Sequence, residues 1–120
     1  MNETAEFQYD LAFTRNIGLL TEAEQACLRR TRVAIPGLGG VGGGHLLALA
    51  RLGVGAFHLA DLEAFELANF NRQLGATMAS IGRPKTDVMD ELARAINPAA
   101  RLHTFPEGIH ADYIYEFLEA

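Results

Sequence analysis

Cysteine is nearly absent from this chain of 120 residues, in which Cys27 is the only one. A single thiol excludes an internal disulfide, a four-thiolate zinc site and a C-x-x-C redox pair. No activating neighbour stands beside Cys27, so the sequence predicts a buried apolar side chain and not a nucleophile. The four histidines lack metal-ligand spacing, and no metal ligand is predicted among these residues.

Basic residues are also scarce. Ten lysines and arginines stand against 15 aspartates and glutamates, which gives a formal net charge of −5 at pH 7. Binding to nucleic acid without sequence specificity needs a basic surface, so no nucleic-acid partner is predicted. No apolar run approaches the roughly 18 residues of a membrane span, and the acidic N-terminus has no basic-then-apolar pattern. We therefore predict a cytoplasmic protein with no membrane partner.

Three catalytic signatures are missing, namely G-x-S-x-G, H-E-x-x-H and a Walker-type G-K-[ST]. What the chain does contain is G-x-G-x-x-G spacing at Gly37, Gly39 and Gly42, directly after the apolar run 33–36. In such a turn, free N–H groups and the positive end of a helix dipole face an anion. Taken alone, the motif also suits an NAD-dependent oxidoreductase or a plain helix packed on a strand.

The apolar pattern predicts one small domain, since 120 residues with 49% hydrophobic side chains support a single core. We expect an N-terminal arm over 1–20 and the domain over 21–120. Helices are predicted over about 21–30, from the glycine turn to 52, over 84–97 and around 113–118, with strands at 31–36, 56–60 and 101–105. Strand, helix and strand in quick succession form a right-handed βαβ unit. The predicted fold is α/β, a Rossmann-like parallel sheet of about three strands with flanking helices.

Acidic residues follow the second predicted strand. Asp61 lies about 20 residues after the glycine turn, where an acid accepts hydrogen bonds from the ribose hydroxyls of a nucleotide. The alternative is an ordinary turn aspartate, which the glycine spacing disfavours. For Glu63 two interpretations stand equally, a second ribose contact or a solvated loop acid.

An arginine and amides cluster in the next loop, at Asn69, Arg72 and Gln73. An ordinary dehydrogenase has no need for them, whereas a guanidinium and amides suit a triphosphate. Lys85 falls in the first turn of a predicted helix, where its ammonium and the dipole can address the same phosphate. The alternative, a surface lysine, is mildly disfavoured by that dipole. Arg83 is predicted to be solvated.

Together these motifs resemble the ThiF/MoeB/HesA group of adenylating enzymes, whose fold is shared by ubiquitin-activating enzymes, over about residues 15–109. The turn G-L-G-G-V-G at 37–42, D-L-E at 61–63, N-F-N-R-Q at 69–73 and I-G-R-P-K at 81–85 match the motifs of the group in order. Glu63 departs from the usual Asp. The resemblance implies ATP, with its ribose on Asp61 and its phosphates against Gly40, Asn69, Arg72 and Lys85.

The implied reaction is attack of a substrate carboxylate on the α-phosphorus, with Arg72 and Lys85 stabilising the developing charge. In most of the group the carboxylate is the C-terminus of a ubiquitin-like or sulfur-carrier protein. A homodimer is implied, in which Arg15 reaches into the ATP site of the partner subunit.

The Mg²⁺ ligand of the group is expected beyond residue 120. We therefore expect this sequence to be the N-terminal half of an adenylation domain that does not complete adenylation alone. Two alternatives stay open, a noncatalytic nucleotide-binding or dimerisation module and, ranked last, an NAD-dependent oxidoreductase domain.

Overall fold

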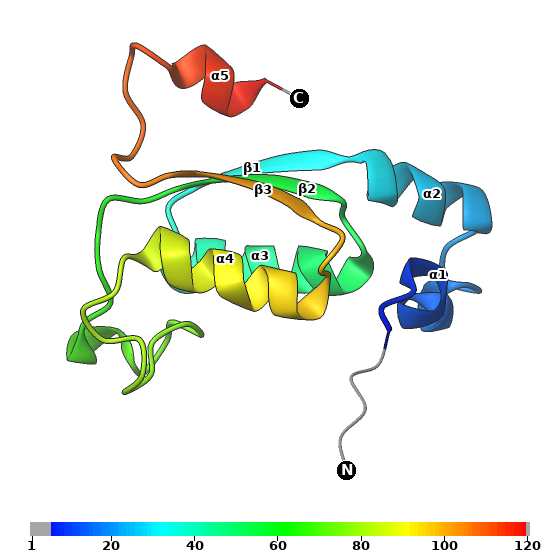
Figure 1. Ribbon diagram of the computed structural model, residues 1–120, viewed down its shortest axis with the longest axis horizontal. Coiled ribbons are helices and arrows are strands. Elements are labelled where there is room, and N and C mark those ends of the chain that lie inside the picture. Colours follow the sequence, from blue (N-terminus) through cyan, green and yellow to red (C-terminus); the bar gives the residue numbers. More distant parts are fainter. Residues whose placement is uncertain (1–5, 120) are drawn as a thin grey trace.

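The computed structural model describes residues 6–119. In chain order the elements are α1 (Tyr9–Ala12), the 3-10 helix η1 (Thr14–Asn16), α2 (Glu22–Arg30), β1 (Arg32–Pro36), α3 (Gly40–Leu52), β2 (Ala56–Ala60), the 3-10 helix η2 (Leu67–Asn69), α4 (Lys85–Ile96), β3 (Arg101–Phe105) and α5 (Ile114–Leu118). The three strands form one parallel sheet in the order β1-β2-β3, with helices packed against it (Figure 1). The predicted fold class is confirmed.

Local signals account for where the helices begin and end. At the start of α2, Thr21 Oγ1 accepts from the Glu24 amide at 3.1 Å and Glu24 Oε1 accepts from the Thr21 amide at 2.8 Å, a complete capping box. Helix α3 ends at Gly53, whose φ of 94° is the left-handed conformation that glycine adopts without strain. Helix α4 begins directly after Pro84, as predicted.

The three strands end level with one another. Pro36 pairs with Ala60, and Ala60 pairs with Phe105, so the carboxyl ends of all three strands lie at the same edge of the sheet. The residues that follow each strand are therefore brought together there, whatever their separation in sequence. This edge is where ligands bind in open parallel α/β sheets.

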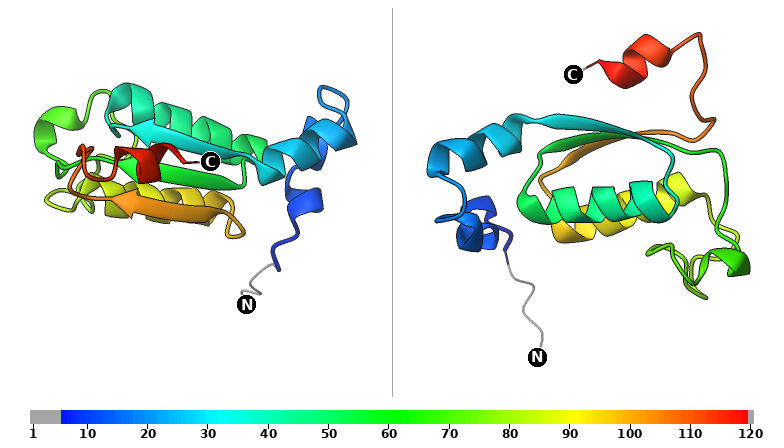
Figure 2. Two further views of the ribbon diagram at one scale, coloured as in Figure 1. Left: turned by 90° about the horizontal axis from the view of Figure 1, so that it is seen from above. Right: turned by 180° about the vertical axis from the view of Figure 1, so that it is seen from behind.

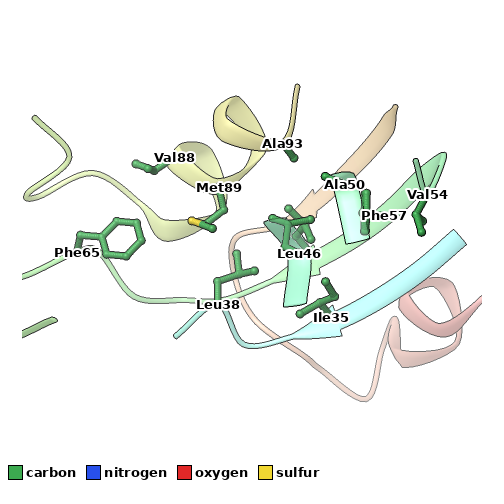
Figure 3. Packing of buried hydrophobic residues seen from close by; sticks show 11 residues of the cluster. Ile35, Leu38, Leu46, Ala50, Val54, Phe57, Phe65, Val88, Met89 and Ala93 are labelled. Atoms are coloured by element: carbon green, nitrogen blue, oxygen red, sulfur yellow. The ribbon is translucent and has the colours of Figure 1, made fainter. Parts of the chain in front are cut away.

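One face of the sheet carries the main core. Helices α3 and α4 both lie on this face, as two successive right-handed crossovers require (Figures 1 and 2). Figure 3 shows Leu38 and Leu46 packed between the sheet and Met89 of α4. The buried cluster is Ile35, Leu38, Leu46, Ala50, Val54, Phe57, Leu59, Phe65, Val88, Met89 and Ala93.

The opposite face is covered by α5. Ala60 and Phe105 of the sheet form a second buried cluster with Phe117 of α5. His58 lies on the same face and is itself buried, with its Nδ1 2.8 Å from the Phe117 carbonyl oxygen. Because both faces of β2 are covered, all five of its residues are buried.

The N-terminal segment folds back on its own chain. Tyr9 and Phe13 are buried, and the Tyr9 hydroxyl donates to the Gly53 carbonyl at 2.5 Å. The Gln25 amide reaches the same hydroxyl at 3.0 Å, which ties α1 to α2 and to the end of α3. The short helices α1 and η1 were not predicted, because elements of three or four residues are set by tertiary contacts and not by periodicity.

The prediction of a buried Cys27 is wrong. Helix α2 turns Gln25 and Leu28 towards the rest of the chain, and Cys27 is exposed on another side. A helix of nine residues with few apolar side chains does not show from its sequence which side docks. Across residues 6–119, no helix has both the length and the apolar character needed to cross a bilayer.

Candidate functional site

A hollow of about 360 Å³ lies at the carboxyl edge of the sheet. The last residues of β1 and β2 and the segment that follows β3 line it. The lining residues are Pro36, Gly37, Ala60, Asp61, Leu62, Glu63, Gly108 and Ile109. Three of the eight, Gly37, Asp61 and Glu63, were predicted from the sequence as site residues, and they include both candidate ribose acids.

The glycine turn runs from the end of β1 into α3. Gly37 has a φ of 93° and donates its N–H to the Ala60 carbonyl at 2.7 Å, which ties the turn to the neighbouring strand. A Cβ on Gly42 would lie 1.8 Å from the Gly37 carbonyl oxygen, so helix and turn approach as closely as the motif predicts. Gly39 caps α3, and the first N–H groups of that helix have no acceptor within the helix.

Asp61 links the second strand to this turn. Its Oδ2 accepts from the Leu38 amide at 2.8 Å and its Oδ1 accepts from the Glu63 amide at 2.8 Å. The carboxylate thus holds the turn in place and retains lone pairs, because two oxygens offer about four acceptor positions. Asp61 is a structural support of the turn in addition to its predicted role as a ribose ligand.

The loop 69–73 lies against the start of α3. The backbone at Gly40 approaches Arg72 closely, because a Cβ added to Gly40 would lie 3.3 Å from the Arg72 carbonyl oxygen and 3.5 Å from its side chain. A Cβ added to Gly39 would lie 3.7 Å from the Gln73 amide nitrogen. The Arg72 guanidinium donates to the Ala68 carbonyl and to Asn71 Oδ1, both at 3.0 Å. Arg72 and Gln73 are therefore neighbours of the glycine turn, as the predicted phosphate site requires.

Two amide side chains of this loop are buried. Asn69 Oδ1 accepts from the Glu66 amide at 2.8 Å, a contact that closes the loop on itself. Gln73 is 7% exposed, and its Oε1 has no hydrogen-bond partner among residues 6–119. A buried carbonyl without a donor is costly, and such groups often mark a place where a ligand completes the bonding.

Lys85 is not a surface residue. It is 3% exposed, and its ammonium lies 3.2 Å from Glu63 Oε1 and 5.6 Å from the centre of the Phe65 ring. The alternative of a solvated lysine at a helix start is therefore wrong. Arg83, by contrast, is solvent-accessible and paired with Glu91 on the surface, in agreement with the prediction.

Arg15 lies at the other end of the molecule. Its neighbour Asn16 donates to the Leu52 carbonyl at the end of α3, whereas the glycine turn is at the start of that helix. A helix of 13 residues is about 20 Å long. The structure therefore does not bring Arg15 to the glycine turn of its own chain, and Figure 2 shows the N-terminal segment beyond the far end of α3.

Gly108 and Ile109 line the hollow and were not predicted as site residues. The rule that identified Asp61 applies to them, because they follow the third parallel strand at the same edge.

A separate hollow of about 380 Å³ lies between α1 and α2, where Arg29 stacks over Tyr9 at 4.3 Å. It contains none of the residues predicted for the nucleotide site. Within the described part of the chain, no three His, Cys, Asp or Glu side chains are grouped to hold a metal ion.

Comparison with known proteins identifies relatives of this chain. The ThiF family model matches residues 13–120. A tRNA threonylcarbamoyladenosine dehydratase of Haemophilus influenzae is 36% identical over 100 residues, which cover 83% of this chain and 38% of that protein. A sulfur carrier protein adenylyltransferase of Thermus thermophilus is 31% identical over 94 residues, which cover 78% of this chain and 35% of that protein.

Solved structures agree with the sequence relatives. The crystal structure of the Escherichia coli tRNA N6-threonylcarbamoyladenosine dehydratase TcdA in complex with ATP superposes with a TM-score of 0.87 at 30% identity. The match covers 92% of this chain and 46% of TcdA. The chain thus spans less than half the length of each of these relatives. The glycine turn, the acid after β2 and the loop 69–73 lie within the matched residues, and the chain belongs to the ThiF family.

Proposed function

We propose that this chain binds ATP at the carboxyl edge of its sheet and is the nucleotide-binding part of an adenylyltransferase. The observation that carries the proposal is the convergence of three sequence motifs on one helix N-terminus. Asp61 bonds to the glycine turn, and Arg72 and Gln73 pack against the first residues of α3. These motifs lie far apart in sequence, so their meeting is a property of the fold.

The chemistry of each group fits ATP. The free N–H groups at the start of α3 and the helix dipole favour phosphate. Asp61 has acceptor positions left for ribose hydroxyls, and the hollow beside it is bounded by Ile109 and Leu62, which suit a base. The Arg72 guanidinium is held by a carbonyl and an amide oxygen and not by a carboxylate, so a phosphate can replace these neutral acceptors.

In the proposed reaction, a substrate carboxylate oxygen attacks the α-phosphorus. The bond from that phosphorus to the bridging oxygen breaks, pyrophosphate leaves and an acyl-adenylate forms. Arg72 and Lys85 stabilise charge on the phosphates, and Arg15 is contributed by a second copy in a homodimer. ATP in such a reaction is bound with Mg²⁺, whose ligand we expect beyond residue 120.

The proposed substrate class is a carboxylate, in the first instance the C-terminus of a ubiquitin-like or sulfur-carrier protein. The adenylyltransferase relatives support this choice. The dehydratase relatives favour a second candidate, threonylcarbamoyladenosine in tRNA, whose threonyl group also carries a carboxylate. The same adenylation chemistry serves both substrates. The acidic composition of this chain provides no electrostatic attraction for RNA.

ATP binding tests the nucleotide site directly. ATP should raise the thermal stability of the chain, because a ligand that binds only the folded state stabilises it. Arg72→Ala should weaken ATP binding about ten- to a hundredfold, the value of hydrogen bonds to a charged group. Arg94→Ala, which removes an arginine paired with Asp90 on α4, is the matched control and should bind ATP normally. Stabilisation by NAD and not by ATP would contradict the proposal.

ATP–pyrophosphate exchange separates adenylation from simple binding. Exchange that depends on an added sulfur-carrier protein or modified tRNA would identify the carboxylate. Robust exchange by this chain alone would contradict the expectation that it needs a further segment. ATP binding without exchange, in a form of the protein that includes the downstream segment, would favour the noncatalytic module.

A further inference from the structure

The segments that carry Glu63 and Lys85 are joined along their backbones. The Lys85 amide donates to the Glu63 carbonyl at 2.9 Å, and the Phe65 amide donates to the Arg83 carbonyl at 3.1 Å. Ala64 and Pro84 form an antiparallel bridge between these two bonds. Residues 22 apart in sequence are thus held side by side, and the position of Glu63 relative to Lys85 is set by the backbone and not only by flexible side chains.

The two side chains of this pair differ sharply in exposure. The Lys85 side chain is 4% exposed and the Glu63 side chain is 67% exposed. A buried ammonium is unfavourable without an anion beside it, and Glu63 Oε1 at 3.2 Å supplies one. The carboxylate, in contrast, needs little to return to water. The glutamate is therefore the member of the pair that can leave.

Glu63 also lines the hollow at the carboxyl edge, whereas Lys85 does not. Of the two residues, Glu63 is therefore the one that borders the hollow, and its Oε1 lies 3.2 Å from the Lys85 ammonium. A polyanion that enters the hollow comes close to a residue of like charge, whose partner is the buried ammonium.

We propose that Glu63 is the resident counter-ion of the Lys85 ammonium and that a nucleotide phosphate displaces it. Glu63 is thus a positioning residue and not a ribose ligand. It keeps the buried ammonium paired and in place until phosphate oxygens accept from the same donor. The exchange keeps one anion on Lys85 throughout, so the buried charge is never left unpaired. This inference rests on the proposed binding of ATP.

If phosphate displaces Glu63, a change at Glu63 should alter the affinity for ATP but not the affinity for adenosine, which has the ribose but no phosphate. Glu63→Gln removes the competing anion, and we expect ATP to bind about fivefold tighter while adenosine binding is unchanged. Without ligand, Glu63→Gln should melt at a lower temperature, because the ammonium loses its partner. Isothermal titration with both ligands and thermal denaturation measure these effects.

Glu91→Gln is the matched control. It likewise replaces a glutamate by a glutamine and also breaks an ion pair, the one between Glu91 on α4 and Arg83 on the surface. Glu91→Gln should leave the binding of ATP and of adenosine unchanged. Glu63→Asp, which shortens the side chain by one methylene, should tighten ATP binding by a smaller factor than Glu63→Gln and serves if Glu63→Gln does not fold.

Three results would overturn the exchange. Weaker adenosine binding by Glu63→Gln would show that Glu63 contacts the ribose. ATP binding no tighter in Glu63→Gln than in Glu91→Gln would show that no carboxylate is displaced. Failure of the wild-type chain to bind ATP would overturn the proposed function together with the exchange, and so is distinguishable from the other two.

Discussion

Gly42 is the residue on which the geometry of the glycine turn depends most directly. A Cβ at this position would lie 1.8 Å from the Gly37 carbonyl oxygen, closer than any nonbonded contact allows, and 3.3 Å from Ile35. The obstacle is backbone and cannot rotate away. Either the start of α3 or the turn itself must move, and with it the N–H groups proposed to hold phosphate.

Gly42→Ala should therefore destabilise the fold by about 2–3 kcal/mol, as overpacked substitutions do, and should also abolish ATP binding. Gly44→Ala is the control in the same helix, because a Cβ there meets nothing within 4 Å. Replacing an unobstructed helical glycine should stabilise the protein by about 0.5–1 kcal/mol. Chemical denaturation measures the free energy of unfolding of both variants. Equal values for Gly42→Ala and Gly44→Ala would contradict the close approach of the turn and the helix.

At the scale of elements, α5 is attached to the sheet through few residues. Phe117 is 1% exposed, and its ring lies 5.2 Å from that of Phe105. The Phe117 carbonyl also receives the His58 contact, and the Tyr113 hydroxyl donates to the Gly108 carbonyl at 3.1 Å. Burial and the carboxylates of Glu107 and Asp112 raise the pKa of Tyr113 above its ordinary value of 10.0, so its hydroxyl stays a donor further into the alkaline range.

Phe117→Ala should release α5 without unfolding the domain. The loss of a buried phenyl ring costs about 3–5 kcal/mol, which is large for a helix of five residues. Hydrogen exchange should then become fast at residues 114–118 while α3 and α4 stay protected. Leu118→Ala, at a side chain that is 60% exposed, is the control and should leave exchange unchanged. Protection of α5 in Phe117→Ala would show that other contacts hold the helix.

At the scale of the whole molecule, the two ends of the sheet carry different parts of the proposed site. The carboxyl edge has the glycine turn and Arg72, and the amino edge has the arm with Arg15 (Figure 1). A role for Arg15 in binding ATP therefore requires a second copy of the chain. The homodimer is a prediction that this geometry makes testable.

Arg15→Ala and Arg72→Ala should each bind ATP weakly when studied alone. In a mixture of the two variants, mixed dimers contain one site with both arginines, since the Arg15→Ala chain supplies Arg72 and its partner supplies Arg15. Random pairing makes half of the dimers mixed, so about a quarter of the sites should regain tight ATP binding. Titration of the mixture measures this fraction. Recovery of no sites, with both variants folded, would mean that Arg15 does not act across a dimer.

Much of the site was predictable because its rules are local. The G-x-G-x-x-G spacing, the acid after the second strand and the capping box at Thr21 each depend on a few neighbouring residues. All three strands were predicted within one residue of their observed bounds. In a parallel sheet the carboxyl ends of the strands meet at one edge, and this arrangement brings Asp61 to the glycine turn.

Other properties depended on contacts between distant residues. The exposure of Cys27 was decided by the side on which α2 docks, and the remoteness of Arg15 by the end of α3 to which the arm is tied. The burial of Lys85 beside Glu63 follows from backbone pairing between segments 22 residues apart. The sequence by itself determined the strands, the helices longer than one turn and the chemical groups that they carry, because backbone propensity and side-chain spacing act over short range. Only the tertiary structure decided which groups are paired and which side of each helix is buried, because packing joins segments that no local pattern connects.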